Sequence, residues 1–360
     1  MTAFSFLLAS LGGVGLFGIR SPAGAQEACY TDQAACPTLV GPDGLWLEPS
    51  GLAWLPEQRV LVGVSDDVGG GRGYELFYIH AEDLGKDEIP VHPLLTPEQS
   101  LAVDVQDLEG LTAVEDTNTL YAIGSLSLDK FPERAADRWN RHHLIRVDVE
   151  QGEDGEVRAR TVEWVAKDRR PDFREWVISS SGRSWAPVAF QGRPESGGLN
   201  VEGLASDARG NLLVGFRGPL DGGRALVLRV APGVADEQPR GLGWLTMDLS
   251  GLPGDRSDPA VWQRGIRGLD RIPGTEEYVG LVGHTGPRYD NLRIIRWNPA
   301  TVDVVDLAEL PESFVGEGIA VMEVTEDSLQ VAVVSDKDAK IMVRRFPRSA
   351  DSVPQPNPGS

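Results

Sequence analysis

Five segments of the chain follow one pattern, and this repetition limits the possible fold more than any other feature of the sequence. Each segment has a polar residue, a glycine and then leucine or isoleucine, followed by a short polar stretch and a run of apolar residues. The repeated glycines are Gly51, Gly110, Gly203, Gly268 and Gly318. Repetition on this scale indicates that one supersecondary unit recurs along the chain.

The distances between the repeats fit four-stranded units. Successive glycines are 59, 93, 65 and 50 residues apart, and one blade of a β-propeller takes about 40–50 residues before long loops are added. In the fourth unit, alternating apolar runs between turn residues predict strands near 265–270 and at 277–283, 292–297 and 301–307. The sequence therefore predicts an all-β protein, a β-propeller with five blades.

The last unit has one strand fewer than the others, and the segment 38–47 before the first unit is free to replace it. An N-terminal strand in the last blade would close the ring and remove two exposed sheet edges. A sixth blade is possible only inside the 93-residue interval, where no further copy of the pattern appears.

That long interval instead indicates two insertions. We expect a short helix on a loop at 129–141 and a longer loop at 167–199. Residues 167–193 hold six basic residues against three acidic ones, although the chain as a whole is acidic. Long loops on a rigid scaffold often carry function. The alternative is that these arginines pair with acidic blade edges.

The N-terminus predicts an exported protein. An apolar run over 4–19 and the small residues Ala23-Gly24-Ala25 are typical of a signal peptide covering 1–25, with a membrane anchor as the alternative. We expect a Cys29–Cys36 disulfide within 26–48, a propeller over 49–347 and a disordered tail over 348–360. The predicted location is periplasmic or extracellular, and the predicted state is a monomer without a membrane span.

The charge of the chain excludes one class of partner. With 34 basic and 54 acidic residues its formal net charge is -20, which repels nucleic acid and anionic membranes. The chain also lacks the G-x-S-x-G, H-E-x-x-H and phosphate-loop signatures. We therefore expect no nucleic-acid partner, and the candidate residues must come from the repeats.

One polar residue per repeat is predicted to line the central channel, because the first strand of each blade faces that channel. These residues are Ser50, Glu109, Glu202, Arg267 and Glu317. Two positions earlier, Asp107 and Asn200 are expected on the same strand faces as Glu109 and Glu202. Carboxylates crowded in a channel need neutralisation.

Three roles for this ring remain open. Arg267 or a Ca²⁺ ion held by Glu109, Glu202 and Glu317 would neutralise the carboxylates, since Ca²⁺ takes oxygen ligands. The acids would otherwise cap backbone amides and pair with Arg267, in a structural role. The third possibility is a ligand site without a metal.

A second ring follows the second strands, and its residues differ from blade to blade as in a binding site. Its predicted ligand-binding residues are Asp66, Ser125, Arg217 and Asp336, which join Asp107, Glu109, Asn200 and Arg267. His284 also belongs to this ring, and with Glu202 it is the candidate for acid–base catalysis. The alternative for His284 is a hydrogen-bonded residue in a turn.

The repeats resemble a known family. The segments DVQDLEGL at 104–111, GLNVEGLA at 198–205 with LLVGFRGPL at 212–220, and GIRGLDRIPG at 265–274 are similar to the bacterial domain-of-unknown-function 3616 family. The E-G-L and E-G-I starts at Glu109, Glu202 and Glu317 give a weaker similarity to esterase-like phytase propellers. The first resemblance implies fold and export, and the second implies a phosphoester or ester hydrolase.

Two functions remain open after these observations. The first is an exported propeller with a small-molecule or anionic ligand at the channel mouth, hydrolytic on a phosphoester or ester. The second is a propeller that binds a ligand or protein without catalysis. Propellers host both kinds of function, so the fold does not decide between them.

Overall fold

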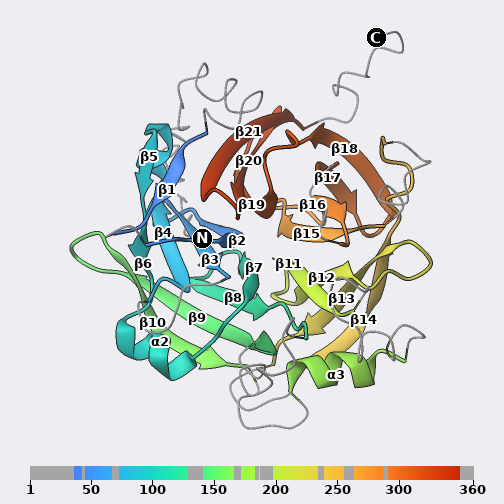
Figure 1. Ribbon diagram of the computed structural model, residues 1–360, viewed down its shortest axis with the longest axis horizontal. Helices are drawn as coiled ribbons and strands as arrows, with labels where there is room; N and C mark the ends of the chain where they lie inside the picture. Colours follow the sequence, from blue (N-terminus) through green and yellow to red (C-terminus); the bar gives the residue numbers. More distant parts are fainter. Residues whose placement is uncertain are drawn as a thin grey trace, which may run out of the picture.

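The computed structural model describes residues 36–42, 45–66, 73–128, 141–165, 172–182, 186, 198–233, 239–254, 263–286 and 291–348. These residues form five sheets arranged in a ring around a central channel (Figure 1). The prediction of a five-bladed propeller is confirmed. The described part of the long interval contains no sixth blade.

The first strand of each blade lies nearest the channel, and the strands of the first four blades pair antiparallel (Figure 1). The first blade comprises β2 (Pro49–Leu55), β3 (Val60–Ser65), β4 (Leu76–His80) and β6 (His92–Pro93). The second comprises β7 (Leu108–Ala113), β8 (Thr119–Gly124), β9 (Leu144–Gln151) and β10 (Val157–Trp164). The third comprises β11 (Asn200–Ser206), β12 (Leu212–Gly218), β13 (Ala225–Ala231) and β14 (Arg240–Met247).

The fourth blade agrees closely with the strands predicted from sequence. It comprises β15 (Arg264–Arg271), β16 (Tyr278–His284), β17 (Arg293–Asn298) and β18 (Asp303–Glu309). Outside the blades lie η3 (Ala81–Gly85), α2 (Pro97–Val103) and α3 (Phe173–Ser180). None of the described helices is long and apolar enough to cross a membrane.

The fifth blade joins the two ends of the propeller. It contains β19 (Gly316–Val324), β20 (Ser328–Ser335), β21 (Lys340–Pro347), β1 (Thr38–Val40) and β5 (Glu88–Pro90). Strand β1 pairs antiparallel with β21 and parallel with β5. The predicted N-terminal closing strand is therefore present, and β5 adds a second connection from the first blade.

The core lies between neighbouring blades. The described residues form five apolar clusters, and each takes residues from two blades that follow one another around the ring. Every blade therefore packs on both faces, which explains why β3, β12 and β20 are buried almost throughout.

The repeated motif forms a β-bulge at the start of every blade. In all five first strands the register shifts at the polar residue before the glycine. A Cβ at the glycine would meet the next blade within 3.0 Å, for example 2.9 Å from the Glu109 carbonyl at Gly51 and 2.6 Å from Ile266 at Gly203. The glycine lets adjacent strands approach, and the bulge re-aims the polar side chain before it.

Several predictions concern residues outside the described ranges. They are the signal peptide at 1–25, Cys29, the insertion over 129–140, most of the loop at 167–199 and the tail after Arg348. The disulfide prediction therefore remains a prediction, although Cys36 is buried. Within the second insertion, 173–180 forms α3.

Candidate functional site

The five residues that follow the repeated glycines form a layer across the channel and divide it into two ends. Their side chains are apolar and buried in every blade, and together these side chains surround a space with no room for water: Leu52, Leu111, Leu204, Leu269 and Ile319. The five bulged residues lie on one side of this layer of apolar side chains, and we call that side the bulge mouth. The turns between first and second strands lie on the other side, which we call the turn end.

Two arginines neutralise part of the bulge mouth. Arg267 is fully buried, donates to Glu317 over 2.8 Å and lies 3.7 Å from Glu202 Oε2. Arg217 donates to Glu202 Oε1 over 2.5 Å, and Asn200 Nδ2 donates to the same oxygen over 3.0 Å. Glu202 is therefore engaged by two cations and an amide, so it is poorly suited to act as a free catalytic base.

A second carboxylate group forms where the first two blades meet. Asp66, Asp107 and Glu109 each offer one oxygen, and these oxygens lie within 4.8 Å of one another. Ser125 donates to Asp107, and Arg141 lies 3.2 Å from Asp107 Oδ2. Within the described ranges, Glu109 Oε2 is buried without a hydrogen-bond partner.

The electrostatics of the bulge mouth follow from burial and mutual repulsion. Desolvation, then the neighbouring Asp107 charge, raises the pKa of Asp66 to about 10. Desolvation, then Asp66, raises the pKa of Glu109 well above its usual value. Desolvation and neighbouring carboxylates raise the pKa of Glu317 to about 8 and that of Asp336 to about 6. Several of these carboxyls therefore keep a proton near neutral pH unless another positive charge enters.

The structure brings most of the predicted second ring to this mouth. Arg217 donates to the carbonyl of Gly286, whose N–H donates to His284 Nδ1 over 2.9 Å. With Nδ1 acting as an acceptor, the neutral ring of His284 carries its proton on Nε2. His284 is therefore arranged as a hydrogen-bond donor beside Arg217 rather than as a general base.

Of the three carboxylates predicted to share a metal, Glu109 alone belongs to the close trio of Asp66, Asp107 and Glu109. Glu202 and Glu317 contact arginines instead. A metal bound jointly by Glu109, Glu202 and Glu317 stays a prediction. The compact trio joins Glu109 to Asp66 and Asp107, which the sequence placed only among ligand-binding residues, and it is better suited to a cation.

Sequence reasoning missed several residues at the rim of the bulge mouth. Arg174 Nε donates to the Leu126 carbonyl over 2.8 Å, and His142 lies 3.2 Å from Asp172. These contacts fasten α3 to the loop that carries Ser125. The excess of basic residues in the insertion was the sequence signal for these contacts. That excess does not indicate which arginine points toward the propeller.

An exposed aromatic side chain also lies beside this mouth. Trp46 is 60% exposed, and its Nε1 donates to Glu48 Oε1 over 3.2 Å. The Glu48 carbonyl accepts from the Asp66 amide over 2.9 Å. An aromatic face therefore stands beside the carboxylates, where a ring-shaped ligand would find a stacking surface.

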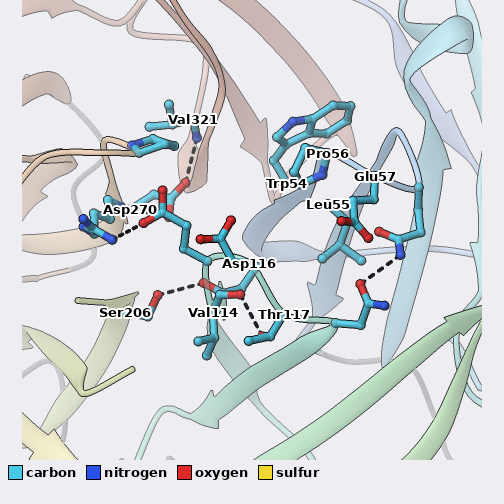
Figure 2. Close-up of a pocket in the computed structure, with 16 residues that line it drawn as sticks. Trp54, Leu55, Pro56, Glu57, Val114, Asp116, Thr117, Ser206, Asp270 and Val321 are labelled. Carbon is cyan, nitrogen blue, oxygen red and sulfur yellow. Dashed lines mark hydrogen bonds and ion pairs between the residues drawn. The ribbon is translucent and has the colours of Figure 1, made fainter. Parts of the chain in front are cut away.

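The turn end holds a separate pocket of about 200 Å³. Figure 2 shows Asp270 and Ser206 on one side of it and Trp54, Pro56 and Glu57 on the other. Asp270 accepts from the Val321 amide over 2.7 Å and from the Arg271 amide over 2.9 Å. This carboxylate therefore ties the fourth blade to the fifth.

Other polar side chains of this pocket are also paired. Glu115 contacts Arg271 and accepts from the Gly274 amide over 3.1 Å. Gln58 donates to Asn118 over 3.0 Å. Desolvation raises the pKa of Asp270 to about 7, and its two amide donors limit the rise. No residue lining this pocket has a buried side-chain polar atom without a hydrogen-bond partner.

Comparison with known proteins yields structural similarity alone. No model of a known protein family matches the sequence, and no curated protein matches it. An arabinanase from Bacillus subtilis is 9% identical with a TM-score of 0.41, covering 84% of this chain and 94% of its own. A gluconolactonase from Xanthomonas campestris is 14% identical with a TM-score of 0.35, covering 84% and 76%. At these scores the similarities support no statement about activity.

Proposed function

We propose that the bulge mouth binds a polar, anionic small molecule and hydrolyses a phosphoester or ester bond in it. The observation that carries this proposal is that partly neutralised carboxyls share the bulge mouth with Arg217 and Arg141, and that Gly286 links His284 to Arg217. Guanidinium and imidazole N–H groups suit anionic oxygens. A carboxyl that titrates near neutral pH suits proton transfer.

Asp336 is the proposed acid–base residue. Its pKa of about 6 lies near neutral pH, and its environment contains Glu317 and the charge of Arg267. Arg217 and His284 would orient the anionic group of the substrate, and Trp46 would contact its organic part. This assignment replaces Glu202 as base, because Glu202 is held by Arg217 and Asn200.

The test is turnover on a panel of phosphomonoesters, phosphodiesters and carboxylic esters, measured with and without Ca²⁺. We expect Asp336→Asn and His284→Ala to lower kcat/KM by about 100-fold or more. The exposed Asp154, far along the second blade, supplies the matched control Asp154→Asn, which should retain full activity. Absence of turnover by the wild-type protein over the whole panel would reject hydrolysis.

Binding without catalysis is the second candidate, favoured by the internal pairing of Glu202 and Glu317 with arginines. Calorimetric titration with inorganic phosphate and simple phosphate esters distinguishes the two. Binding that requires Arg217, without turnover, would support this second function.

We also propose that the protein is exported after cleavage near Ala25, as its apolar N-terminus suggests. Mass measurement of the mature protein recovered from its native compartment tests this proposal. A full-length chain retained inside the cell would contradict it.

A further inference from the structure

We propose that Asp66, Asp107 and Glu109 form a binding site for one hard divalent cation, with Ca²⁺ as the ion to test. The three carboxylates come from the end of β3 in the first blade and the start of β7 in the second. Oxygens that share a Ca²⁺ ion lie about 2.3–2.6 Å from it, so they stand at most about 5 Å apart. The spacing of these three oxygens, all within 4.8 Å of one another, satisfies that limit.

Independent support comes from Glu109. This side chain is only 8% exposed, and its Oε2 has no hydrogen-bond partner in the described part of the chain. A buried carboxylate oxygen without a donor is costly, and native proteins seldom retain one. A bound cation would satisfy it.

Comparison with the other bulged glutamates sharpens this point. Glu317 contacts Arg267 over 2.8 Å and Glu202 contacts Arg217 over 2.5 Å. Glu109 occupies the equivalent bulge in the second blade, yet Asp66 and Asp107 lie beside it, and Glu202 and Glu317 also act to raise its pKa. The position that an arginine fills beside the other two glutamates is thus surrounded here by further carboxylates.

The neighbouring groups fit a hard cation rather than a soft one. All three side chains offer oxygen, which suits Ca²⁺, Mg²⁺ or Mn²⁺. Ser125 donates to Asp107 and fixes the orientation of that carboxylate. Arg141 lies 3.2 Å from Asp107 Oδ2 but shows no ion pair with Asp66 or Glu109, so it neutralises only part of the trio.

Three carboxylates do not fill the coordination shell of Ca²⁺, which takes 6–8 oxygens. Asp66 is only partly buried, so the trio is accessible from the mouth. A phosphate or ester oxygen would fit there as a further ligand, which deepens the proposed function. The cation site itself rests on the carboxylates alone and is measurable without any substrate.

The experiment is calorimetric titration of the EDTA-treated full-length protein with CaCl₂, and separately with MgCl₂, at neutral pH. We expect one bound Ca²⁺ with a Kd of about 1 mM or tighter. Glu109→Gln and Asp66→Asn should each weaken binding by about 10-fold or more. Glu57→Gln, an exposed acid at the turn end, is the matched control and should bind as the wild type does.

Two outcomes would overturn the proposal. One is absence of saturable Ca²⁺ and Mg²⁺ binding up to about 10 mM. The other is wild-type affinity in the Glu109→Gln protein, whose folding is checked by circular dichroism. If Asp66→Asn fails to fold, the Glu109→Gln result decides. Cation binding without hydrolysis would reject the proposed catalysis and leave the site in place, whereas hydrolysis without cation binding would do the reverse.

Discussion

The two ends of the central channel are both acidic, but their carboxylates differ in the hydrogen-bond and ion-pair partners that they have. At the turn end, Asp270 accepts from two backbone amides and Glu115 contacts both Arg271 and an amide. At the bulge mouth, Glu109 Oε2 has no hydrogen-bond partner within the described ranges, and Asp66 lies against two further carboxylates.

This difference indicates which end is the better candidate for a functional site. A fully paired polar network rigidifies a fold, whereas an unsatisfied one needs another explanation, such as a ligand or catalysis. The turn end therefore reads as a structural connection between blades, even though it contains a well-formed pocket. We therefore propose the bulge mouth as the functional end, and we expect its carboxylates to contribute less to stability than those of the turn end.

Arg267 offers the strongest test of this comparison, because it is the buried cation of the bulge mouth. Arg267→Met leaves Glu202 and Glu317 with less neutralisation and should lower the free energy of unfolding by about 3–5 kcal/mol. Urea denaturation measures the effect. The exposed Arg158 supplies the control, and Arg158→Met should leave the free energy of unfolding nearly unchanged. A loss below about 1 kcal/mol for Arg267→Met would show that the arginine is not the main neutralising group.

At the turn end, Asp270→Ala should lower the free energy of unfolding by about 2–3 kcal/mol, because the amides of Arg271 and Val321 lose their acceptor. Urea denaturation beside Glu57→Ala, an exposed residue of the same pocket, checks this value. If both variants were equally stable, the pocket would not be the structural connection described above.

In the absence of divalent cations, Glu109→Gln should change the free energy of unfolding in the opposite direction to Asp270→Ala. Burial raises the pKa of Glu109, so folding at neutral pH carries the cost of protonating this carboxyl. Glutamine avoids that cost and should raise the free energy of unfolding by about 1 kcal/mol. Glu115→Gln, at the turn end, weakens an existing ion pair and should be destabilising by a similar amount. Thermal denaturation in EDTA compares the two variants, and a shift of the same sign in both would break the contrast between the ends.

The smallest expected effect is a dependence on pH. Glu317 and Asp336 have pKa values of about 8 and about 6 in the folded protein, raised from 4.5 and 3.8. The folded state therefore binds more protons than the unfolded chain between the ordinary and the raised pKa of each group. Their contribution to stability is complete in acid and is lost as pH rises. We expect a fall of about 1 kcal/mol between about pH 5 and 8.

A Glu317→Gln variant should flatten this dependence. Asp270, with a pKa of about 7, contributes in the same direction from the turn end, so a residual slope should remain in that variant. Urea denaturation across the pH range, with Asp154→Asn as control, measures both. An unchanged slope in Glu317→Gln would assign the effect to other groups.

The blades were predictable because strand runs and turn residues are local signals. The fourth blade matched its predicted strands to within about two residues. The closing strand was predictable for a different reason, since an incomplete last unit demands a partner for its edge.

The composition of the site was less predictable. The bulge at Glu109 is a one-residue shift in strand register, and only the following glycine hints at it. The trio also brings Asp66 of one blade against Asp107 of the next, a contact that depends on how the ring closes. Pairing of Glu202 with Arg217 depends likewise on side-chain direction after the bulge.

The seam between β1 and β21 has a consequence for the order in which the molecule is made. Thr38 pairs with both Lys340 and Glu88, so a segment that leaves the ribosome early waits for a partner synthesised near the end of the chain. Until β1 docks, the edge of β21 is open to the same segment of a second molecule, which would produce a domain-swapped dimer. Rapid refolding at low protein concentration should therefore favour the monomer, and crowded refolding should trap exchanged pairs.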